Sequence, residues 1–419
     1  MPDNPGPGMQ PSAGRPDVGR VVVVGASLAG VRAAETLRTM GFSGDLVVVG
    51  DEAHTPYDRP PLSKEMLTAE TEPEIGLRAV SNGLDATLEL GVAATALRVH
   101  DQELDLADGR MMGYDGLVIA TGCSARELPG TTGMSRVRTL RTLDDARTLR
   151  HLLRSEARRV VVVGGGFIGL EVAASCRTLG IEVTLVEPLP QPLARVLGEP
   201  LGAVVADLHR SHGVDVRVGV GVSTVEQRQS GPSDAVRVDL SDGETIDAEV
   251  VVVGIGVTPR TQWLEGSGLS IDNGIVCDST TLAGPGVVAA GDIARWYNPL
   301  FDEVMRVEHW EHALEMGSHA AKRLLSDDAS ALDFSPVPWF WSDQYDRKIQ
   351  FAGRAHPDDE QVLVAGSLEE NRFCVVYGRA GRLVGVLGMN MPAQVVRYRR
   401  QIAEQVDWDD VTAQEPKPG

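Results

Sequence analysis

Two segments of this sequence place glycines where the backbone could bind phosphate groups. Residues 25–30 read GASLAG and residues 164–169 read GGGFIG, and each follows a run of four valines. A glycine turn between a buried strand and a helix directs free N–H groups at the helix start toward an anion. Each segment therefore predicts a site for the diphosphate of a dinucleotide, contacted by Gly25, Ser27 and Gly30 in the first segment and by Gly164, Gly166 and Gly169 in the second.

The first segment departs from the usual pattern at its middle position. Ser27 stands there, whereas the second segment has Gly166. A glycine at this position lets the diphosphate approach the backbone closely. Serine is a small substitute whose hydroxyl can donate a hydrogen bond to a phosphate, so the site is expected to tolerate it.

An acidic residue follows each glycine segment at the distance expected for a ribose contact. Asp51 lies 26 positions after Gly25, and Glu187 lies 23 positions after Gly164. Such an acid accepts hydrogen bonds from adenosine ribose hydroxyls, and it repels a 2′-phosphate. Since no basic residue stands between Glu187 and Arg195, the second site is predicted to prefer NADH over NADPH.

Three further residues suit a flavin, the usual partner of a nicotinamide in a chain with two dinucleotide sites. Lys64 ends the segment DRPPLSK, whose two prolines stiffen the loop, so its ammonium could stabilise negative charge on a reduced flavin. Asp292 ends an apolar strand and could accept a hydrogen bond from a ribityl hydroxyl. A helix beginning near Trp310 would direct its positive end toward the flavin edge.

The elements that must position these residues repeat along the chain. Each glycine segment leads through a helical stretch into a second apolar strand, giving two βαβ units that predict an α/β protein with two doubly wound dinucleotide-binding domains. Beyond residue 335 the pattern changes to that of a small α+β C-terminal domain, with strand-like segments at Gln361–Ala365, Arg372–Tyr377 and Leu383–Leu387 and a helix near Pro392–Gln405.

Charge and composition exclude several classes of function. The net charge is 39 − 59 = −20, which disfavours general binding to nucleic acid or to an anionic membrane. No apolar run approaches the roughly 20 residues of a membrane-spanning helix. Residues 1–19 are rich in proline, glycine and polar residues and are expected to form a disordered leader.

Cysteine and histidine spacing argues against thiol and metal chemistry. The four cysteines lie at least 53 positions apart, so the sequence contains no CxxC pair, and a reducing cytoplasm is the expected compartment. His309 and His312 lack a third ligand region, so no metal site is predicted. His209 and His212 are interpreted as part of a solvated helix face.

At this point the sequence resembles a known family, the FAD-dependent, NADH-using ferredoxin reductases of bacterial oxygenase systems. The resemblance covers about residues 20–410. It rests on motifs in the family's order and spacing, namely GASLAG, PYDRPPLSK, LVIATG, LRTLDDA, VVVGGGFIGLE, GIGVTP, AAGD and PWFWSDQY. It implies a fold like glutathione reductase, with an FAD-binding domain split over residues 20–125 and 255–330, a NAD-binding domain at 126–254 and a C-terminal interface domain at 331–419.

The resemblance also implies roles for individual residues. Those expected to contact FAD are Ala29 and Asp51 at the diphosphate and adenosine, Lys64, Ala94 and Arg141 along the site, Asp292 at the ribityl chain and Trp310 at the flavin edge. Those expected at the nicotinamide site are Phe167, Ile168 and Glu171, with Gly256 of GIGVTP. Trp341 is expected near the flavin and the face that docks the partner.

The implied reaction passes a hydride from NADH to FAD and then single electrons to a small iron–sulfur ferredoxin. That ferredoxin would serve a cytochrome P450 or another oxygenase. A basic patch containing Arg397, Arg399 and Arg400 could attract it to an otherwise acidic protein. A rubredoxin reductase, an NADH oxidase and a redox sensor of the same fold remain alternatives, although the PLSK segment lacks the redox cysteine of an oxidase.

Overall fold

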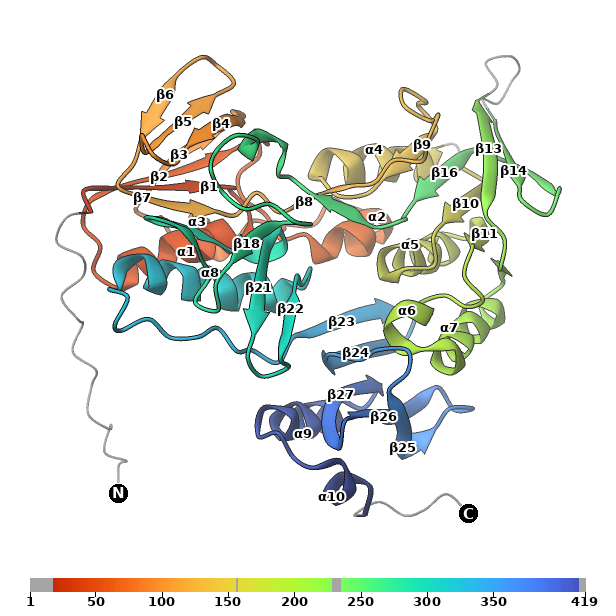
Figure 1. The fold of residues 1–419 in the computed structure, drawn as a ribbon. Coiled ribbons are helices and arrows are strands. Elements are labelled where there is room, and N and C mark those ends of the chain that lie inside the picture. Colours follow the sequence, from red (N-terminus) through yellow and green to blue (C-terminus); the bar gives the residue numbers. More distant parts are fainter. Residues whose placement is uncertain (1–17, 156, 228–234, 414–419) are drawn as a thin grey trace, which may run out of the picture. The chain divides into compact units, whose positions relative to one another are not determined.

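The computed structural model describes residues 18–155, 157–227 and 235–413, so most of the predicted leader lies outside the described residues. The chain divides into two compact units, each built from separate segments (Figure 1). The first unit comprises residues 1–58, 76–123 and 259–336. The second comprises residues 59–75, 124–258 and 337–419. The chain thus leaves the first unit after residue 58, returns at residue 76 and leaves it again after residue 123.

The first unit is built around a six-stranded sheet with the order β19-β20-β7-β1-β2-β3. All neighbouring pairs are parallel except β19 with β20. The valines of β1 are buried, as expected for a central parallel strand, and helices α1 and α8 pack against this sheet. The strands are β1 (Arg20–Val24), β2 (Asp45–Gly50), β3 (Thr87–Leu90), β7 (Gly116–Ile119), β19 (Leu282–Gly284) and β20 (Val287–Ala289).

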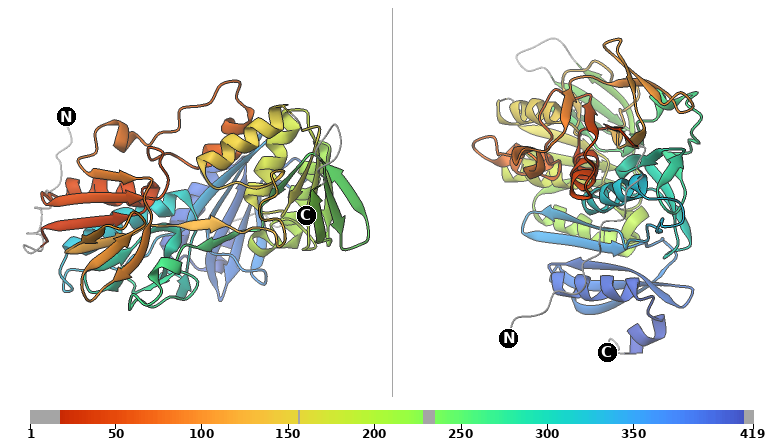
Figure 2. Two further views of the ribbon diagram at one scale, coloured as in Figure 1. Left: turned by 90° about the horizontal axis from the view of Figure 1, so that it is seen from above. Right: turned by 90° about the vertical axis from the view of Figure 1, so that its left-hand side faces the viewer.

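Two helices of the first unit lie side by side, α1 (Leu28–Thr39) and α8 (Trp310–Leu325), as both views in Figure 2 show. They approach closely because Gly317 of α8 faces the backbone of Ala29, where a Cβ atom would lie 2.4 Å from the carbonyl oxygen. The remaining elements of this unit are α3 (Arg78–Ser81), the sheet of β4 (Ala94–Arg98), β5 (Glu103–Leu106) and β6 (Met111–Gly113), and the sheet of β18 (Ile275–Cys277), β21 (Ala294–Asn298) and β22 (Glu303–Met305).

The second unit contains a five-stranded parallel sheet with the order β12-β11-β10-β16-β9. Its strands are β9 (Val137–Thr139), β10 (Arg159–Val163), β11 (Glu182–Glu187), β12 (Val214–Val218) and β16 (Val250–Val253). Its helices are α2 (Glu65–Thr68), α4 (Leu143–Ser155), α5 (Phe167–Thr178), α6 (Ala194–Leu197) and α7 (Glu199–Ser211). A three-stranded antiparallel sheet is formed by β13 (Val222–Gln227), β14 (Val236–Leu240) and β15 (Thr245–Ala248).

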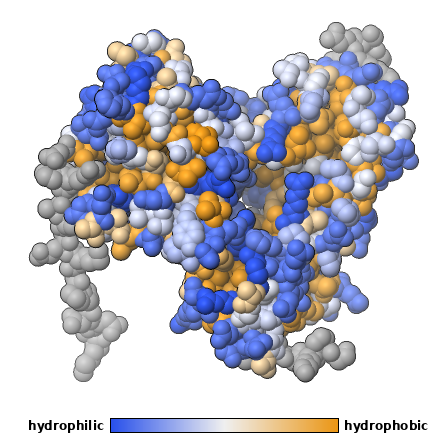
Figure 3. Space-filling model, viewed as in Figure 1, coloured by the Kyte–Doolittle hydropathy of each residue, from blue (hydrophilic) through white to orange (hydrophobic). Residues whose placement is uncertain are grey.

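The C-terminal part of the second unit is a five-stranded antiparallel sheet with helix α9 (Pro392–Ala403) lying along β27 (Figure 2). Its strands are β23 (Trp339–Gln344), β24 (Arg347–Gly353), β25 (Glu360–Ser367), β26 (Arg372–Arg379) and β27 (Arg382–Met389), followed by α10 (Trp408–Ala413). The strands and the helix predicted from the sequence beyond residue 335 are confirmed. The surface over α9 and α10 is largely hydrophilic (Figure 3).

A short two-stranded ribbon accompanies the passage of the chain between the units. It pairs β8 (Cys123–Ala125) with β17 (Val257–Pro259). Strand β8 directly follows the LVIATG motif, and β17 forms the end of the GIGVTP motif. Among the described helices, none is both long enough and apolar enough to cross a bilayer.

Candidate active site

The glycine turn of the first unit requires glycine for reasons within the protein itself. Gly25 has a φ of +119°, and a Cβ atom there would lie 2.2 Å from the carbonyl oxygen of Ala120. A Cβ atom on Gly30 would lie 1.9 Å from the carbonyl oxygen of Gly25. The turn therefore sits tightly between the carboxyl ends of β1 and β7, where a doubly wound sheet binds its ligand.

Ser27 is the residue directly before α1. Its backbone is extended, and its side chain makes no capping hydrogen bond to the helix. The first N–H groups of any α-helix have no acceptor within the helix. Those of α1 begin at Leu28, so hydroxyl and amide donors lie together at the end of the turn. This arrangement suits a diphosphate at the position predicted from the sequence.

The glycine turn of the second unit repeats this geometry. Gly164 has a φ of +104°, and its added Cβ would lie 2.4 Å from the carbonyl oxygen of Gly254. A Cβ on Gly169 would lie 2.1 Å from the carbonyl oxygen of Gly164. Gly166 differs, because its φ is −77° and the nearest protein atom to an added Cβ is 3.8 Å away. Nothing within the described protein requires glycine there, so the open space beside it suits a ligand that approaches the backbone.

Glu187 ends β11 beside this turn and is buried. Its Oε2 accepts a hydrogen bond from the backbone N–H of Gly165 at 2.7 Å, and its Oε1 accepts one from the N–H of Leu189 at 2.8 Å. The carboxylate is therefore fixed at the mouth of the glycine turn, the location expected of a ribose acceptor. Gly256, with a φ of +98°, has no atom within 4 Å of an added Cβ.

Asp51 in the first unit has a partner that the sequence analysis missed. Its carboxylate forms an ion pair with Arg260, a residue 209 positions away. The backbone of Arg260 is also fixed locally, because its N–H donates to the carbonyl oxygen of Gly122 at 3.0 Å. Arg260 directly follows the GIGVTP motif, but nothing in the sequence indicates which acid it meets. The acid predicted to contact adenosine thus has an arginine beside it.

Lys64 and Glu171 form a buried ion pair in the second unit. Lys64 Nζ lies 2.8 Å from Glu171 Oε2, with side chains 14% and 4% exposed. The same Oε2 accepts a hydrogen bond from Ser63 Oγ at 2.5 Å, and Oε1 accepts one from Ser342 Oγ at 2.7 Å. The structure therefore brings the two predicted residues, Lys64 and Glu171, together with the hydroxyls of two serines. Both serines lie in motifs that the sequence analysis quoted, PLSK and WSDQY, but neither serine was predicted as a site residue.

The remaining predicted residues are divided between the units. In the first unit, Trp310 begins α8 and its Nε1–H donates to Asp58 at 2.6 Å, Asp292 lies in a short 3-10 helix, and Ala94 begins β4. In the second unit, Arg141 precedes α4, and its carbonyl accepts a hydrogen bond from Arg59 Nε at 3.3 Å. The structure confirms the helix predicted to begin near Trp310.

Strand β23 presents two different faces because alternate side chains of a strand point in opposite directions. On one face, the ring of Phe340 lies 4.6 Å from that of Phe167 at the start of α5. On the other, the rings of Trp339 and Trp341 lie 5.4 Å apart, and the guanidinium of Arg399 lies 5.8 Å from the Trp339 ring. Trp341 thus belongs to an aromatic and cationic face that includes α9.

The sequence interpretation of His209 was wrong. His209 is fully buried rather than solvated, with Nε2 at 2.9 Å from Gln344 Oε1 and Nδ1 at 3.0 Å from Tyr345 OH. The C-terminal sheet covers this face of α7, which no local pattern reveals. His212 does lie on the surface, where its ring stacks on Tyr345 at 3.7 Å.

All four cysteines of the chain are buried and form no disulfide. Burial raises the pKa of Cys176 to about 12, and burial followed by the charge of Asp278 raises that of Cys277 to about 12. Neither thiol is therefore available as a nucleophile near neutral pH. Across the described residues, no group of three or more candidate ligands is placed to hold a metal ion.

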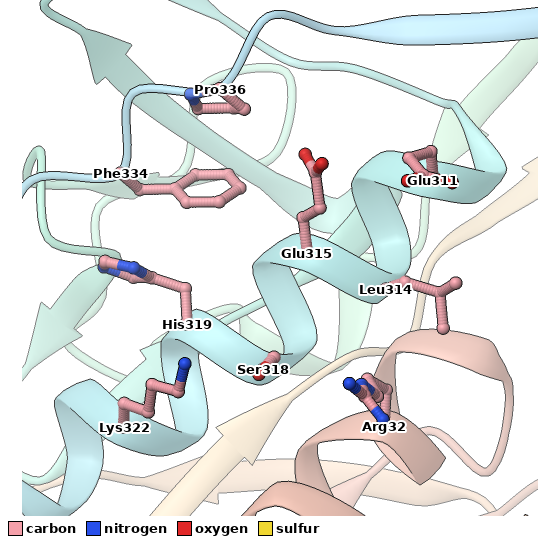
Figure 4. Close-up of a pocket in the computed structure, with 9 residues that line it drawn as sticks. All are labelled: Arg32, Glu311, Leu314, Glu315, Ser318, His319, Lys322, Phe334 and Pro336. Atoms are coloured by element: carbon pink, nitrogen blue, oxygen red, sulfur yellow. The ribbon is translucent and has the colours of Figure 1, made fainter. Parts of the chain in front are cut away.

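One open pocket of about 660 Å³ lies on the first unit, between α8, Arg32 of α1 and the segment at Phe334 and Pro336 (Figure 4). Its walls carry both signs of charge, with Glu311, Glu315 and Lys322 on α8 and Arg32 on α1. None of the predicted site residues is among the nine that line it.

Comparison with known proteins agrees with this architecture. The family model described as pyridine nucleotide-disulphide oxidoreductase matches residues 19–317, and the one described as reductase C-terminal matches residues 339–418. The fold and the two glycine turns thus define an oxidoreductase of the pyridine nucleotide-disulphide class with an appended C-terminal domain.

Individual relatives indicate a narrower family within this class. The chain is 35% identical over 398 residues to putidaredoxin reductase of Pseudomonas putida, covering 92% of each chain. It is 36% identical to the ferredoxin–NAD(+) reductase component of a p-cumate 2,3-dioxygenase system from Pseudomonas putida, covering 96% of this chain and 97% of the relative. The solved covalent complex of putidaredoxin reductase with putidaredoxin matches with a TM-score of 0.87 and 34% identity, over 94% of this chain and 95% of that one. This chain belongs to the ferredoxin reductase family of bacterial oxygenase systems.

Proposed function

We propose that this protein transfers electrons from NADH, through bound FAD, to a small iron–sulfur ferredoxin that serves a cytochrome P450 or another oxygenase. The observation that carries the proposal is the pair of glycine turns, one in each unit, each placed between parallel strands and opening a helix. Family membership over nearly the whole chain supports the same reading. A cytoplasmic location belongs to the proposal, because none of the four buried cysteines forms a disulfide.

FAD would occupy the first unit. Gly25, Ser27, Ala29 and Gly30 form the turn and the helix start that would receive its diphosphate, and Asp51 would meet its adenosine. Within this unit, we assign the ribityl contact to Asp292, the flavin edge to Trp310, and a further contact to Ala94. FAD accepts two electrons together and releases them singly, which is the chemistry that this chain itself lacks.

NADH would occupy the second unit. Gly164, Gly166 and Gly169 would receive its diphosphate, and the fixed carboxylate of Glu187 would accept the ribose hydroxyls. Phe167, Ile168, Glu171 and Gly256 would flank the nicotinamide. Lys64 and Glu171 hold each other in one position, so that they can orient the reacting ring without first paying for their own ordering.

We expect a clear preference for NADH over NADPH. The buried Glu187 carboxylate would repel a 2′-phosphate, and the loop after it offers no basic residue before Arg195. The ratio kcat/KM should favour NADH by about tenfold or more, equivalent to about 1.4 kcal/mol. Steady-state reduction of ferricyanide with each nucleotide measures this ratio, and equal values would contradict the assignment of Glu187.

The basic residues of α9 are proposed to dock the ferredoxin. Arg399 lies against Trp339, Arg397 lies 4.9 Å from the Tyr398 ring, and Arg400 is paired with Glu404 at 2.8 Å. Arg399 therefore adjoins the tryptophan face of β23, while the charge of Arg400 is already offset.

Reversing the charge of Arg399 and of Arg400 one at a time should show how much each contributes to ferredoxin binding. Arg399→Glu is expected to raise the KM for ferredoxin about tenfold at low salt, and Arg400→Glu less, because Arg399 adjoins the tryptophan face of β23 and electrostatic steering is strongest close to the docking face. Ferricyanide reduction serves as the control and should not change. Equal losses with ferredoxin and ferricyanide would contradict a docking role.

Absence of an accessible thiol argues against the NADH oxidase alternative. Oxidases of this fold use a redox cysteine, and the four cysteines here are buried.

Turnover with ferredoxin distinguishes a ferredoxin reductase from a rubredoxin reductase and from a redox sensor. Purified protein should be yellow and should reduce cytochrome c with NADH only when its ferredoxin is added. Loss of this dependence on ferredoxin, or colourless protein that does not bind added FAD, would contradict the proposed function.

A further inference from the structure

A buried series of side-chain hydrogen bonds runs from Glu171 into the C-terminal sheet of the second unit. Glu171 Oε1 accepts from Ser342 Oγ at 2.7 Å, and Ser342 Oγ lies 3.1 Å from Gln344 Nε2. Gln344 Oε1 lies 2.9 Å from His209 Nε2, and His209 Nδ1 lies 3.0 Å from Tyr345 OH. We call these five residues the Glu171 chain.

The inner members of the Glu171 chain are shielded from water. Ser342, Gln344 and His209 are 0% exposed, and Glu171 is 3% exposed. At the outer end, the ring of Tyr345 is covered by the stacked ring of His212. Since a polar atom buried without a partner is costly, a chain that satisfies each member in turn is held in one arrangement.

The carboxylate of Glu171 determines which group donates and which accepts in every hydrogen bond of the Glu171 chain. An ionised carboxylate only accepts, so Ser342 must give its single proton to Glu171 and must accept from the Gln344 amide. Gln344 then presents its oxygen to His209, which must donate from Nε2 and accept at Nδ1 from Tyr345. The chain therefore fixes one neutral tautomer of His209.

Burial also favours the neutral form of His209. Desolvation lowers its pKa to about 4, so the imidazole is neutral at pH 7. A primary amide cannot pass a proton along without leaving an unstable tautomer, so the Gln344 step prevents the chain from conducting protons. What such a chain provides is a fixed position for the carboxylate at its end.

We propose that Ser342, Gln344 and His209 are positioning residues, which hold the Glu171 carboxylate against Lys64 in the geometry needed for hydride transfer from NADH. The expected effect on the rate of hydride transfer rests on the proposed function. The hydrogen bonds of the Glu171 chain do not depend on it. It makes strand β23 of the C-terminal sheet a structural part of the nicotinamide site. The opposite face of the same strand carries Trp339 and Trp341, so one strand contributes both to NADH oxidation and to the proposed docking face.

The first test measures the tautomer of His209. In FAD-loaded protein labelled with ¹⁵N-histidine, the ring signals of His209, assigned by their loss in His209→Asn, should show a proton on Nε2 and none on Nδ1 at pH 7. Glu171→Gln replaces the acceptor-only end by an amide that can also donate, so the His209 signals should change although two residues, Ser342 and Gln344, lie between Glu171 and His209 in the Glu171 chain. A proton on Nδ1 in the unaltered protein, or no response to Glu171→Gln, would overturn the directed chain.

The second test measures flavin reduction by NADH in a stopped-flow experiment. Ser342→Ala and Gln344→Met each remove one link, and the limiting rate should fall about three- to tenfold, the usual effect of one hydrogen bond. Ser342→Thr keeps the hydroxyl and should restore most of the rate. Gln350→Met is the matched control, because Gln350 is a buried glutamine of the adjacent strand that lies opposite Trp341 in the register and outside the chain.

The outcomes separate the two proposals. If the unaltered protein binds no FAD or does not oxidise NADH, the proposed function fails. The tautomer of His209, measured on the protein as purified, still tests the Glu171 chain. If Ser342→Ala and Gln344→Met keep the rate of the Gln350→Met control, the positioning role is refuted. Should one of these variants fail to fold, the other and the tautomer measurement still decide.

Discussion

Gly169→Ala is expected to abolish NADH-dependent reduction. The added Cβ would lie 2.1 Å from the carbonyl oxygen of Gly164, so helix α5 has to move away from the turn that holds the diphosphate. Overpacking against the backbone costs about 1–3 kcal/mol or more of folding stability. Urea unfolding and NADH oxidation, measured on the same preparation, should therefore both deteriorate.

Gly166→Ala is the informative comparison for Gly169→Ala. Its φ of −77° suits alanine, and the nearest protein atom to the added Cβ is 3.8 Å away. We expect unfolding stability equal to or slightly above that of the unaltered protein, because alanine restricts the unfolded chain more than glycine does. The KM for NADH should nevertheless rise about tenfold, since the methyl group occupies the space proposed for the diphosphate. An unchanged KM would mean that the nucleotide does not approach the backbone at Gly166.

The regular elements around both turns follow from local sequence. Four consecutive valines predict a strand buried on both faces, and the glycine turn with small residues behind it predicts the helix start. The alternation of apolar strands with turn residues beyond residue 335 likewise predicts the C-terminal sheet. These features depend on neighbouring residues, so the sequence contains what is needed to predict them.

Side-chain partners across distant segments could not be predicted in this way. Asp51 and Arg260 are 209 positions apart, and Glu171 and Ser342 are 171 positions apart, so their contacts depend on how whole elements pack. His209 shows the same limit, because the element that buries it is the later sheet. The sequence indicated the residue types of the site, whereas the structure was needed to show which of them share a hydrogen bond.

The ion pair of Lys64 with Glu171 should show a marked asymmetry when its members are removed singly. Glu171→Met leaves the ammonium of Lys64 and the hydroxyls of Ser63 and Ser342 without their common acceptor in a site where the two charged side chains are 14% and 4% exposed. Breaking a buried pair in this way costs about 3–5 kcal/mol. Lys64→Met should cost less, because the carboxylate keeps both hydroxyl donors.

The double variant Lys64→Met/Glu171→Met distinguishes this explanation from simple loss of packing. Once both charges are gone, no ammonium remains buried without a counter-charge, so the double variant should be more stable than Glu171→Met alone. A double-mutant cycle from urea unfolding of the FAD-loaded protein gives the coupling, which we expect to exceed about 1 kcal/mol. Strict additivity of the two single effects would show that the pair contributes no interaction energy. The geometry would then serve the nicotinamide site alone, and the cost of Glu171→Met would come from the two serine hydroxyls.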